Sequence, residues 1–168
     1  MNRTSLHAAC ITGTLDIVQW LLNHGADVNT QSDEGSYPIS SAVGWGHLQV
    51  ARMLIAFNAD IGVRREFGRG LLHMAAGRFN DDHVSVIRLL LDHGANPNAR
   101  DDDGSTPLHH SSWWIGGVQG TVEGTRLLLK YGAIIDAEDN EGRTPLQLAL
   151  EQDRQDMAIC LREHGATR

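Results

Sequence analysis

Nine histidines give this chain its most obvious capacity for chemistry, because an imidazole ring binds transition metals and exchanges protons near neutral pH. The adjacent pair His109 and His110 and the run Asp81–His83 are the places where a metal site would be sought. Protein zinc sites combine such ligands with others at short, fixed spacings, often with paired cysteines. The two cysteines, Cys10 and Cys160, instead lie near opposite ends of the chain. We therefore expect neither a metal nor another cofactor.

Catalytic patterns are equally weak in this sequence. The acidic run Asp101–Asp103 resembles a carboxylate site, but a solvated turn explains it as well, since Asp stabilises tight turns. Gly116, Gly117 and Gly120 form a glycine cluster without the lysine of a phosphate-binding loop. The serine-centred glycine motif of the hydrolases does not occur. We predict that the chain is not an enzyme.

Tryptophan and arginine suit another kind of chemistry, the recognition of a protein surface, because they combine a large contact area with polar groups. Aromatic residues make up only 5% of the chain, so each one stands out. We predict that a partner binds a central group of aromatic and arginine residues, namely Trp45, Arg64, Phe67, Arg69, Arg78, Phe79, Trp113 and Trp114. For Phe79 and Trp113, packing against nearby inserted loops is an equally good explanation.

Composition and charge narrow the other possibilities. Of the 168 residues, 41% are hydrophobic and 21% are charged, which is typical of a folded, soluble chain. The formal net charge of −7 disfavours nucleic acid as a partner, since such binding needs a basic face. No apolar run approaches the length of a membrane span or a secretory signal. Since no disulfide is expected, we place the protein in the cytoplasm or nucleus. We also expect a monomer.

A repeated motif organises the sequence. Thr106-Pro107-Leu108-His109 recurs, more or less closely, in copies whose first residues are 4, 37, 70, 106 and 144, which are separated by 33, 33, 36 and 38 positions. A second landmark, Gly-Ala or Asn-Ala, closes each copy at residues 25, 58, 94, 132 and 165. Two landmarks in the same register define a single domain over residues 1–168. Its five repeats are approximately 2–31, 32–64, 65–100, 101–138 and 139–168.

Two insertions interrupt this period, at Phe79–Asp82 in repeat three and at Ile115–Gln119 in repeat four. Since they lie in consecutive repeats, we expect them to be neighbours at the edge away from the turns that begin each repeat. They either extend the binding surface or are tolerated extra length, because longer loops cost little free energy.

Each landmark has a physical role in a helix-turn-helix unit. Threonine caps the start of a short helix, and proline fits its first turn. The second helix carries the larger apolar residues, among which we interpret Trp20 as core, and the closing glycine permits the left-handed conformation that ends a helix. One helix pair cannot bury its apolar face alone, so the pairs must stack. The fold class is therefore all-α, a solenoid of five helix-turn-helix repeats.

The segment Asp101–His109 and the segment Gly25–Asn29 together resemble the signature of the ankyrin repeat family. The resemblance implies β-turn fingers, a concave face formed by fingers and first helices, and the binding of protein partners. It also implies that His7, His73 and His109 hydrogen-bond between neighbouring turns. Asn29 lies in the family's pattern for asparagine hydroxylation, but we interpret it as a residue that stabilises its hairpin.

We therefore predict a protein-interaction module that binds its partner on the finger and first-helix face of repeats two to four. The alternative is a regulatory ankyrin segment of a larger signalling protein or enzyme. Repeat two departs most from the pattern, with Ser40, Ser41 and Asn58 in place of the usual residues, and is the expected weak point of the stack.

Overall fold

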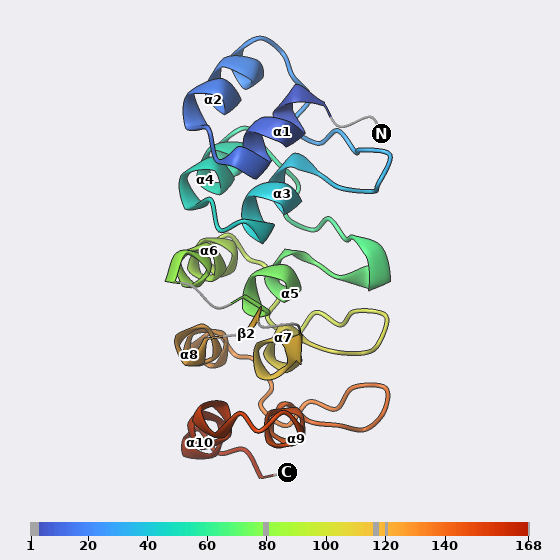
Figure 1. Ribbon diagram of the computed structural model, residues 1–168, viewed down its shortest axis with the longest axis vertical. Coiled ribbons are helices and arrows are strands. Elements are labelled where there is room, and N and C mark those ends of the chain that lie inside the picture. The colour runs from blue at the N-terminus through green and yellow to red at the C-terminus, as the bar shows by residue number, and fades with distance from the viewer. Residues whose placement is uncertain (1–3, 79–80, 116–117, 120, 168) are drawn as a thin grey trace.

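The computed structural model describes residues 4–78, 81–115, 118–119 and 121–167. These residues form an elongated row of helix pairs with the chain ends at opposite ends of the row (Figure 1). First helices form one column and second helices another, and loops project from the first-helix column on the side away from the second helices (Figure 1). The elements are α1 (Ser5–Thr12), α2 (Leu15–Asn23), α3 (Pro38–Gly44), α4 (Leu48–Ala56), the 3-10 turn η1 (Glu66–Gly68), α5 (Leu71–Ala76), α6 (Asp81–Asp92), α7 (Pro107–Ser112), β1 (Trp114–Ile115), β2 (Val118–Gln119), α8 (Val122–Lys130), α9 (Pro145–Glu151) and α10 (Gln155–Glu163).

The predicted all-α solenoid is confirmed, and its helices begin and end where the local chemistry places them. In α9, Thr144 accepts a hydrogen bond from the backbone of Gln147, and Pro145 occupies the first turn. Gly94, which closes repeat three, has a φ of 86°, a conformation that favours glycine. One small feature was not predicted: β1 and β2 pair antiparallel within the insertion of repeat four.

The core runs continuously from α1 to α10 and belongs to the stack rather than to any single repeat. Val86 and Leu90 of α6 are fully buried, as are Leu128 of α8 and Leu161 of α10. Complete burial of such a side chain contributes about 1.5–3 kcal/mol. Both cysteines are free and buried in this core.

The prediction that Trp20 is a core residue is wrong. Its side chain is 58% exposed, and it stacks on His24 with the ring centroids 4.0 Å apart. The positions that match Ile17 and Trp20 in repeat five, Met157 and Cys160, are buried although no later repeat packs on them within the described residues. These positions therefore face the preceding repeat, and on α2 they have no such neighbour within the described residues.

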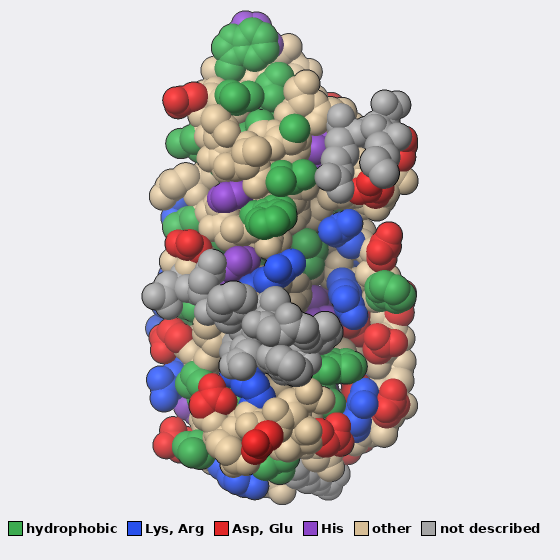
Figure 2. All heavy atoms as spheres, viewed as in Figure 1, with side chains coloured by type: hydrophobic (Ala, Val, Ile, Leu, Met, Phe, Trp, Pro, Cys, Tyr) green, Lys and Arg blue, Asp and Glu red, His purple; other side chains and the backbone are tan. Residues whose placement is uncertain are grey.

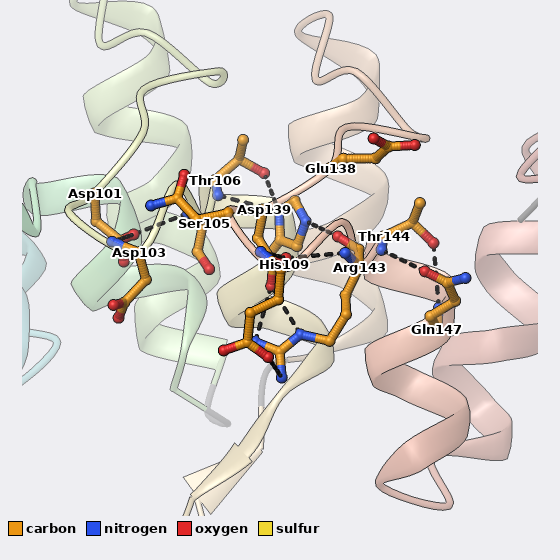
Figure 3. A network of polar contacts seen from close by, with 12 residues as sticks. Asp101, Asp103, Ser105, Thr106, His109, Glu138, Asp139, Arg143, Thr144 and Gln147 are labelled. Atoms are coloured by element: carbon orange, nitrogen blue, oxygen red, sulfur yellow. Dashed lines mark hydrogen bonds and ion pairs between the residues drawn. The ribbon is translucent and has the colours of Figure 1, made fainter.

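Buried polar bridges join successive repeats along the first-helix column. His7, His73 and His109 each donate a hydrogen bond from Nε2 to a carbonyl of the next finger, at Ser36 (2.8 Å), Ser105 (3.1 Å) and Arg143 (3.0 Å) respectively. Figure 3 shows the His109 bridge, with Nδ1 of the same ring accepting from Thr106. The bridging role that the family resemblance implied for these histidines is confirmed.

A second set of bridges follows the second-helix column. The Asn29 amide donates to the Asn58 carbonyl and accepts from the Asp60 N–H, and Asn98 makes the same pair of bonds to Gly132 and Ile134. The interpretation of Asn29 as a stabilising residue therefore has a specific basis. It links the ends of repeats one and two.

Both bridges are missing between repeats two and three in the described structure. Ser40 stands where the histidines stand, and its side chain hydrogen-bonds within its own repeat, to Tyr37 and Ser36. Gly62 stands where the asparagines stand and has no side chain. The bridge that remains, from His83 Nε2 to the Gly44 carbonyl, is long at 3.4 Å.

The backbone hydrogen bonds between fingers are also missing between repeats two and three in the described structure. Fingers three and four are joined by a bond from the Asp102 N–H to the Phe67 carbonyl, and fingers four and five by one from Asn140 to Asp103. No backbone bond joins residues 32–36 to residues 65–69 among those that the structure describes. Among the described residues, this interface therefore depends mainly on apolar packing of α3 on α5 and of α4 on α6, to which His83 and Arg64 add hydrogen bonds.

We predict that the stack opens first between repeats two and three. Backbone amides of α1–α4 should lose protection from hydrogen exchange at lower urea concentration than those of α5–α10. Ser40→His and Gly62→Asn should each restore a bridge and raise the free energy of unfolding of the first two repeats by about 1 kcal/mol. Hydrogen exchange measured by mass spectrometry over a urea series tests this. A single transition shared by all five helix pairs would contradict it.

Candidate functional site

Four fingers share one backbone design. Numbered by their repeats, fingers two to five cover residues 32–36, 65–69, 101–105 and 139–143. In each, the N–H of the first residue donates to the carbonyl of the fifth, at 2.8–3.0 Å. In finger five the first residue, Asp139, accepts from the backbone of Glu141 and Arg143 and forms an ion pair with the Arg143 guanidinium at 2.9 Å (Figure 3). Finger four uses Asp101 in the same way toward its own backbone.

Finger three departs from this design in charge and in conformation. Arg65 stands where Asp101 and Asp139 stand, so the finger carries arginines at both its first and its fifth position. Phe67 has a φ of 60° and is followed by Gly68 at 66°. A bulky residue in this region is strained, at a cost of roughly 1–2 kcal/mol. Phe67 is nevertheless 61% exposed, with the Arg69 guanidinium 5.3 Å from its ring centroid.

Beside this finger lies a hollow of about 380 Å³ on the face formed by fingers and first helices. It is lined from finger three, α5 and α7, by Arg65, Glu66, Phe67, Arg69, His73, Met74, Gly77, Arg78, His110 and Trp113. Figure 2 shows positively charged side chains gathered at mid-height on this face, with acidic side chains toward the outer edge.

Four of the residues predicted to bind a partner line this hollow together: Phe67, Arg69, Arg78 and Trp113. They come from two consecutive repeats, which supports the idea of a shared surface. Trp113 follows α7 and is half-buried, and the Arg143 guanidinium lies 5.6 Å from its ring centroid. This tryptophan therefore contacts the fingers as well as the hollow.

The other predicted residues lie elsewhere. Trp45 ends α3 and is 62% exposed, but it does not line the hollow. A Cβ on its neighbour Gly44 would lie 3.3 Å from Met74, so the end of α3 adjoins the hollow. Arg64 donates to the carbonyls of Gly68 and Arg100 and so links fingers three and four. Phe79 lies outside the described residues, and of Trp114 only the backbone, in β1, is described.

Sequence reasoning missed Arg65, His73, Met74 and His110 as members of this site. Arg65 could have been found by comparing the fingers, because it replaces an aspartate with an opposite charge. Met74 and His110 stand at the same position of their first helices as Ala8 and Ser41 do in repeats one and two. The stacking alone decides which side chains at this position are exposed. The meeting of Met74 and His110 with finger three is a tertiary contact.

A buried polar cluster supports the floor of the hollow. His110 Nε2 donates to Asp101 Oδ2 at 2.7 Å, and the His110 ring meets the His73 ring edge-on with centroids 5.1 Å apart. Burial alone would raise the pKa of Asp101, but the hydrogen bond and charge of His110, the backbone bond from Ser105 and the charge of His73 together outweigh it, so that the pKa lies below its ordinary value. Asp101 therefore stays ionised, and both of its carboxylate oxygens accept hydrogen bonds within the fold.

His73 is held in its neutral form. Its Nδ1 accepts from the Gly70 N–H at 3.2 Å while Nε2 donates to Ser105, so a second proton would face a donor. Burial, reinforced by the charge of His110, lowers the pKa of His73 from 6.5 to about 4. The imidazole is therefore a structural donor at neutral pH and not a proton-transfer group.

The described residues include no group of three or more His, Cys, Asp or Glu side chains placed to hold a metal ion. None of their helices is long and apolar enough to cross a membrane. A second, more shallow hollow of about 360 Å³ lies between α8 and α10, away from the fingers.

Stacked helix pairs with projecting fingers define a solenoid repeat protein. The family model described as ankyrin repeats in three copies matches residues 42–119 and 72–167, and one described as ankyrin repeats in many copies matches residues 6–55. The chain belongs to the ankyrin repeat family.

Similar proteins come from distant organisms. The chain is 35% identical over 89 residues to BCL-6 corepressor-like protein 1 of Homo sapiens, 33% over 113 residues to E3 ubiquitin-protein ligase KEG of Arabidopsis thaliana, and 40% over 97 residues to a putative ankyrin repeat-containing protein of Treponema pallidum. The matches cover 51%, 66% and 57% of this chain, but only 5%, 7% and 32% of those relatives. The chain thus spans less than a third of the length of each.

The low pKa of His73 predicts a specific loss of stability in acid. The unfolded chain takes up a proton at this residue near pH 6.5 and the folded chain only near pH 4, so the stabilising effect is complete above 6.5 and is lost as the pH falls toward 4. His73→Gln, which copies Gln147 of repeat five, should reduce the drop in unfolding free energy between pH 7 and pH 4.5 by about 2–3 kcal/mol.

Urea denaturation of both proteins at the two pH values measures this difference. Exposed His93→Gln is the control, because its ring bonds only to the Leu89 carbonyl of its own helix. An equal drop for His73→Gln and the unmodified chain would contradict the prediction.

Proposed function

We propose that this chain is a protein-interaction module that binds a partner on the finger and first-helix face of repeats two to four. The observation that carries the proposal is the hollow beside finger three, where Phe67, Arg69, Arg78 and Trp113 meet. Aromatic and arginine side chains of this kind dominate the binding energy of protein interfaces. The proposal includes no catalytic activity.

The conformation of Phe67 favours a binding role over a structural one. The aromatic ring is mostly exposed, so it gains little from burial, and its backbone is in a strained region. The residues at the same place in fingers two, four and five are Glu34, Asp103 and Glu141, and all three have negative φ. Strain without a folding benefit is a feature of functional sites.

Trp45 extends the proposed surface toward repeat two. Trp45 directly follows Gly44, the last residue of α3, and Gly44 lies close to Met74, which lines the hollow. Phe79 and Trp114 remain candidates for the proposed surface. We propose a monomer in the cytoplasm or nucleus, consistent with two free, buried thiols.

An alternative proposal is a regulatory segment of a larger signalling protein or enzyme. The relatives named above are much longer than the matched stretches, and two plant relatives are named as E3 ubiquitin-protein ligases. Such a segment would use the same face to bind a partner of the larger protein. The two proposals therefore differ in the chain around the module and not in the site itself.

Phe67→Asn should separate folding from binding. Asparagine tolerates a positive φ, so the variant should be at least as stable as the unmodified chain, with a gain of up to about 1 kcal/mol. Capture of protein partners from a cell lysate should fall at least tenfold, because about 1.4 kcal/mol or more of interface energy is lost. Thermal denaturation and quantitative mass spectrometry of captured proteins measure the two effects.

The matched control is Trp20→Ala, which removes another exposed aromatic ring at the far end of the stack. Capture should be unaffected by this change. Unaltered capture by Phe67→Asn, or an equal loss with Trp20→Ala, would place the interface outside the proposed face.

A further inference from the structure

Comparison of the fingers reveals a missing carboxylate. In finger five, Asp139 Oδ2 accepts from both Nε and NH2 of Arg143, at 3.0 and 2.9 Å. Finger three has the same five-residue backbone bond, and Arg69 stands at the position of Arg143. The position of Asp139 is taken by Arg65, so the group that would pair with Arg69 is replaced by a second positive charge.

No carboxylate around finger three in the described structure replaces this missing partner of Arg69. The nearest partner of Arg69 is Asp101, whose Oδ2 lies 4.0 Å from Nε, beyond hydrogen-bonding distance. Asp101 is already bonded to His110 and to the backbone of Asp103 and Ser105. The Nε atoms of Arg65 and Arg69 are buried and have no hydrogen-bond partner in the described structure.

Arg78 adds a third positive charge to the same hollow. It follows α5 and is exposed, and no ion pair of its guanidinium is found among the described residues. Four other arginines are satisfied within the fold: Arg143 and Arg154 pair with carboxylates, and Arg64 and Arg100 bond to carbonyls. Arg52, Arg88 and Arg162 are exposed on three different second helices. The hollow thus brings together three guanidinium groups, of which only Arg69 has a carboxylate nearby in the described structure, at 4.0 Å, in a chain of net charge −7.

We infer that the hollow binds an acidic side chain of its protein partner, an Asp or Glu carboxylate in an extended segment, flanked by an apolar residue. This inference rests on the proposed function and names the chemistry of its partner. The carboxylate supplies the negative charge that Asp139 supplies in finger five and pairs with Arg65, Arg69 and Arg78. The apolar neighbour contacts Met74, Phe67 and Trp113, which line the same hollow.

The surroundings favour a single carboxylate over a polyanion such as nucleic acid. Glu66 lines the hollow itself, and Asp102 and Asp103 are exposed on the next finger. These charges would repel the successive phosphates of a polyanion that ran past the three arginines. A peptide with one acidic residue between uncharged ones avoids that repulsion.

The test uses an array of random nine-residue peptides as the probe, with each Asp and Glu also synthesised as Asn or Gln. The unmodified chain should prefer the acidic member of a pair by about tenfold at one position next to an apolar residue. Arg65→Asp rebuilds the ion pair of finger five, so it should abolish this preference while the melting temperature stays equal or rises. If Arg65 had a merely structural role, its replacement would lower the melting temperature.

Two further variants complete the design. Arg52→Asp makes the same change in charge on the exposed side of α4 and should keep the preference. Arg78→Gln, at an exposed position, should weaken it about threefold without affecting folding. The inference is overturned if the unmodified chain shows no acidic preference or binds no peptide, if Arg65→Asp retains the preference, or if Arg52→Asp loses it.

Preferred binding of a single-stranded oligonucleotide or of phosphoserine peptides would also overturn the assignment to a carboxylate. The proposed function is judged separately, because capture from lysate that depends on Phe67 does not require an acidic partner. Peptide binding without acidic preference would therefore leave the interaction face in place and remove only its assigned chemistry.

Discussion

A pair of helices as short as these cannot cover its own apolar side chains, and every other property of the molecule depends on how the next pair covers them. Positions such as Val86 and Leu89 of α6 are buried because a preceding helix packs on them, whereas Ile17 and Trp20 at the same places on α2 are exposed. The chain therefore grows as a row, and each residue's environment depends on its neighbour in the row. Stability is local and is shared only between adjacent repeats.

Polar bridges decide how firmly adjacent repeats are joined. The buried histidines must be bonded because an unsatisfied polar group in the core costs about 1–3 kcal/mol, and the carbonyl they use belongs to the next finger. Where serine and glycine replace histidine and asparagine, at Ser40 and Gly62, the link is lost without leaving an unpaired group. Repeats three to five, which hold the hollow, form the better-joined part of the stack.

The fingers and first helices provide a frame in which single substitutions change function without changing the fold. The bond between the first and fifth residue of a finger is the same whether the first residue is Ser32, Arg65 or Asp139, because it uses only backbone atoms. The side chain at that position is therefore free to vary in charge. Finger three uses this freedom to gather arginines beside exposed aromatic rings.

The sequence by itself determined the number of repeats, their helices and the family, because caps, turns and apolar spacing act over a few residues. It also singled out Phe67, Arg69, Arg78 and Trp113. Only the tertiary structure decided that these four meet, that Arg65 and Met74 join them, and that Trp45 and Arg64 do not. The same holds for the exposure of Trp20 and the low pKa of His73. Each of these depends on contacts between residues about one repeat apart, and no local pattern encodes which side chains the stacking brings together.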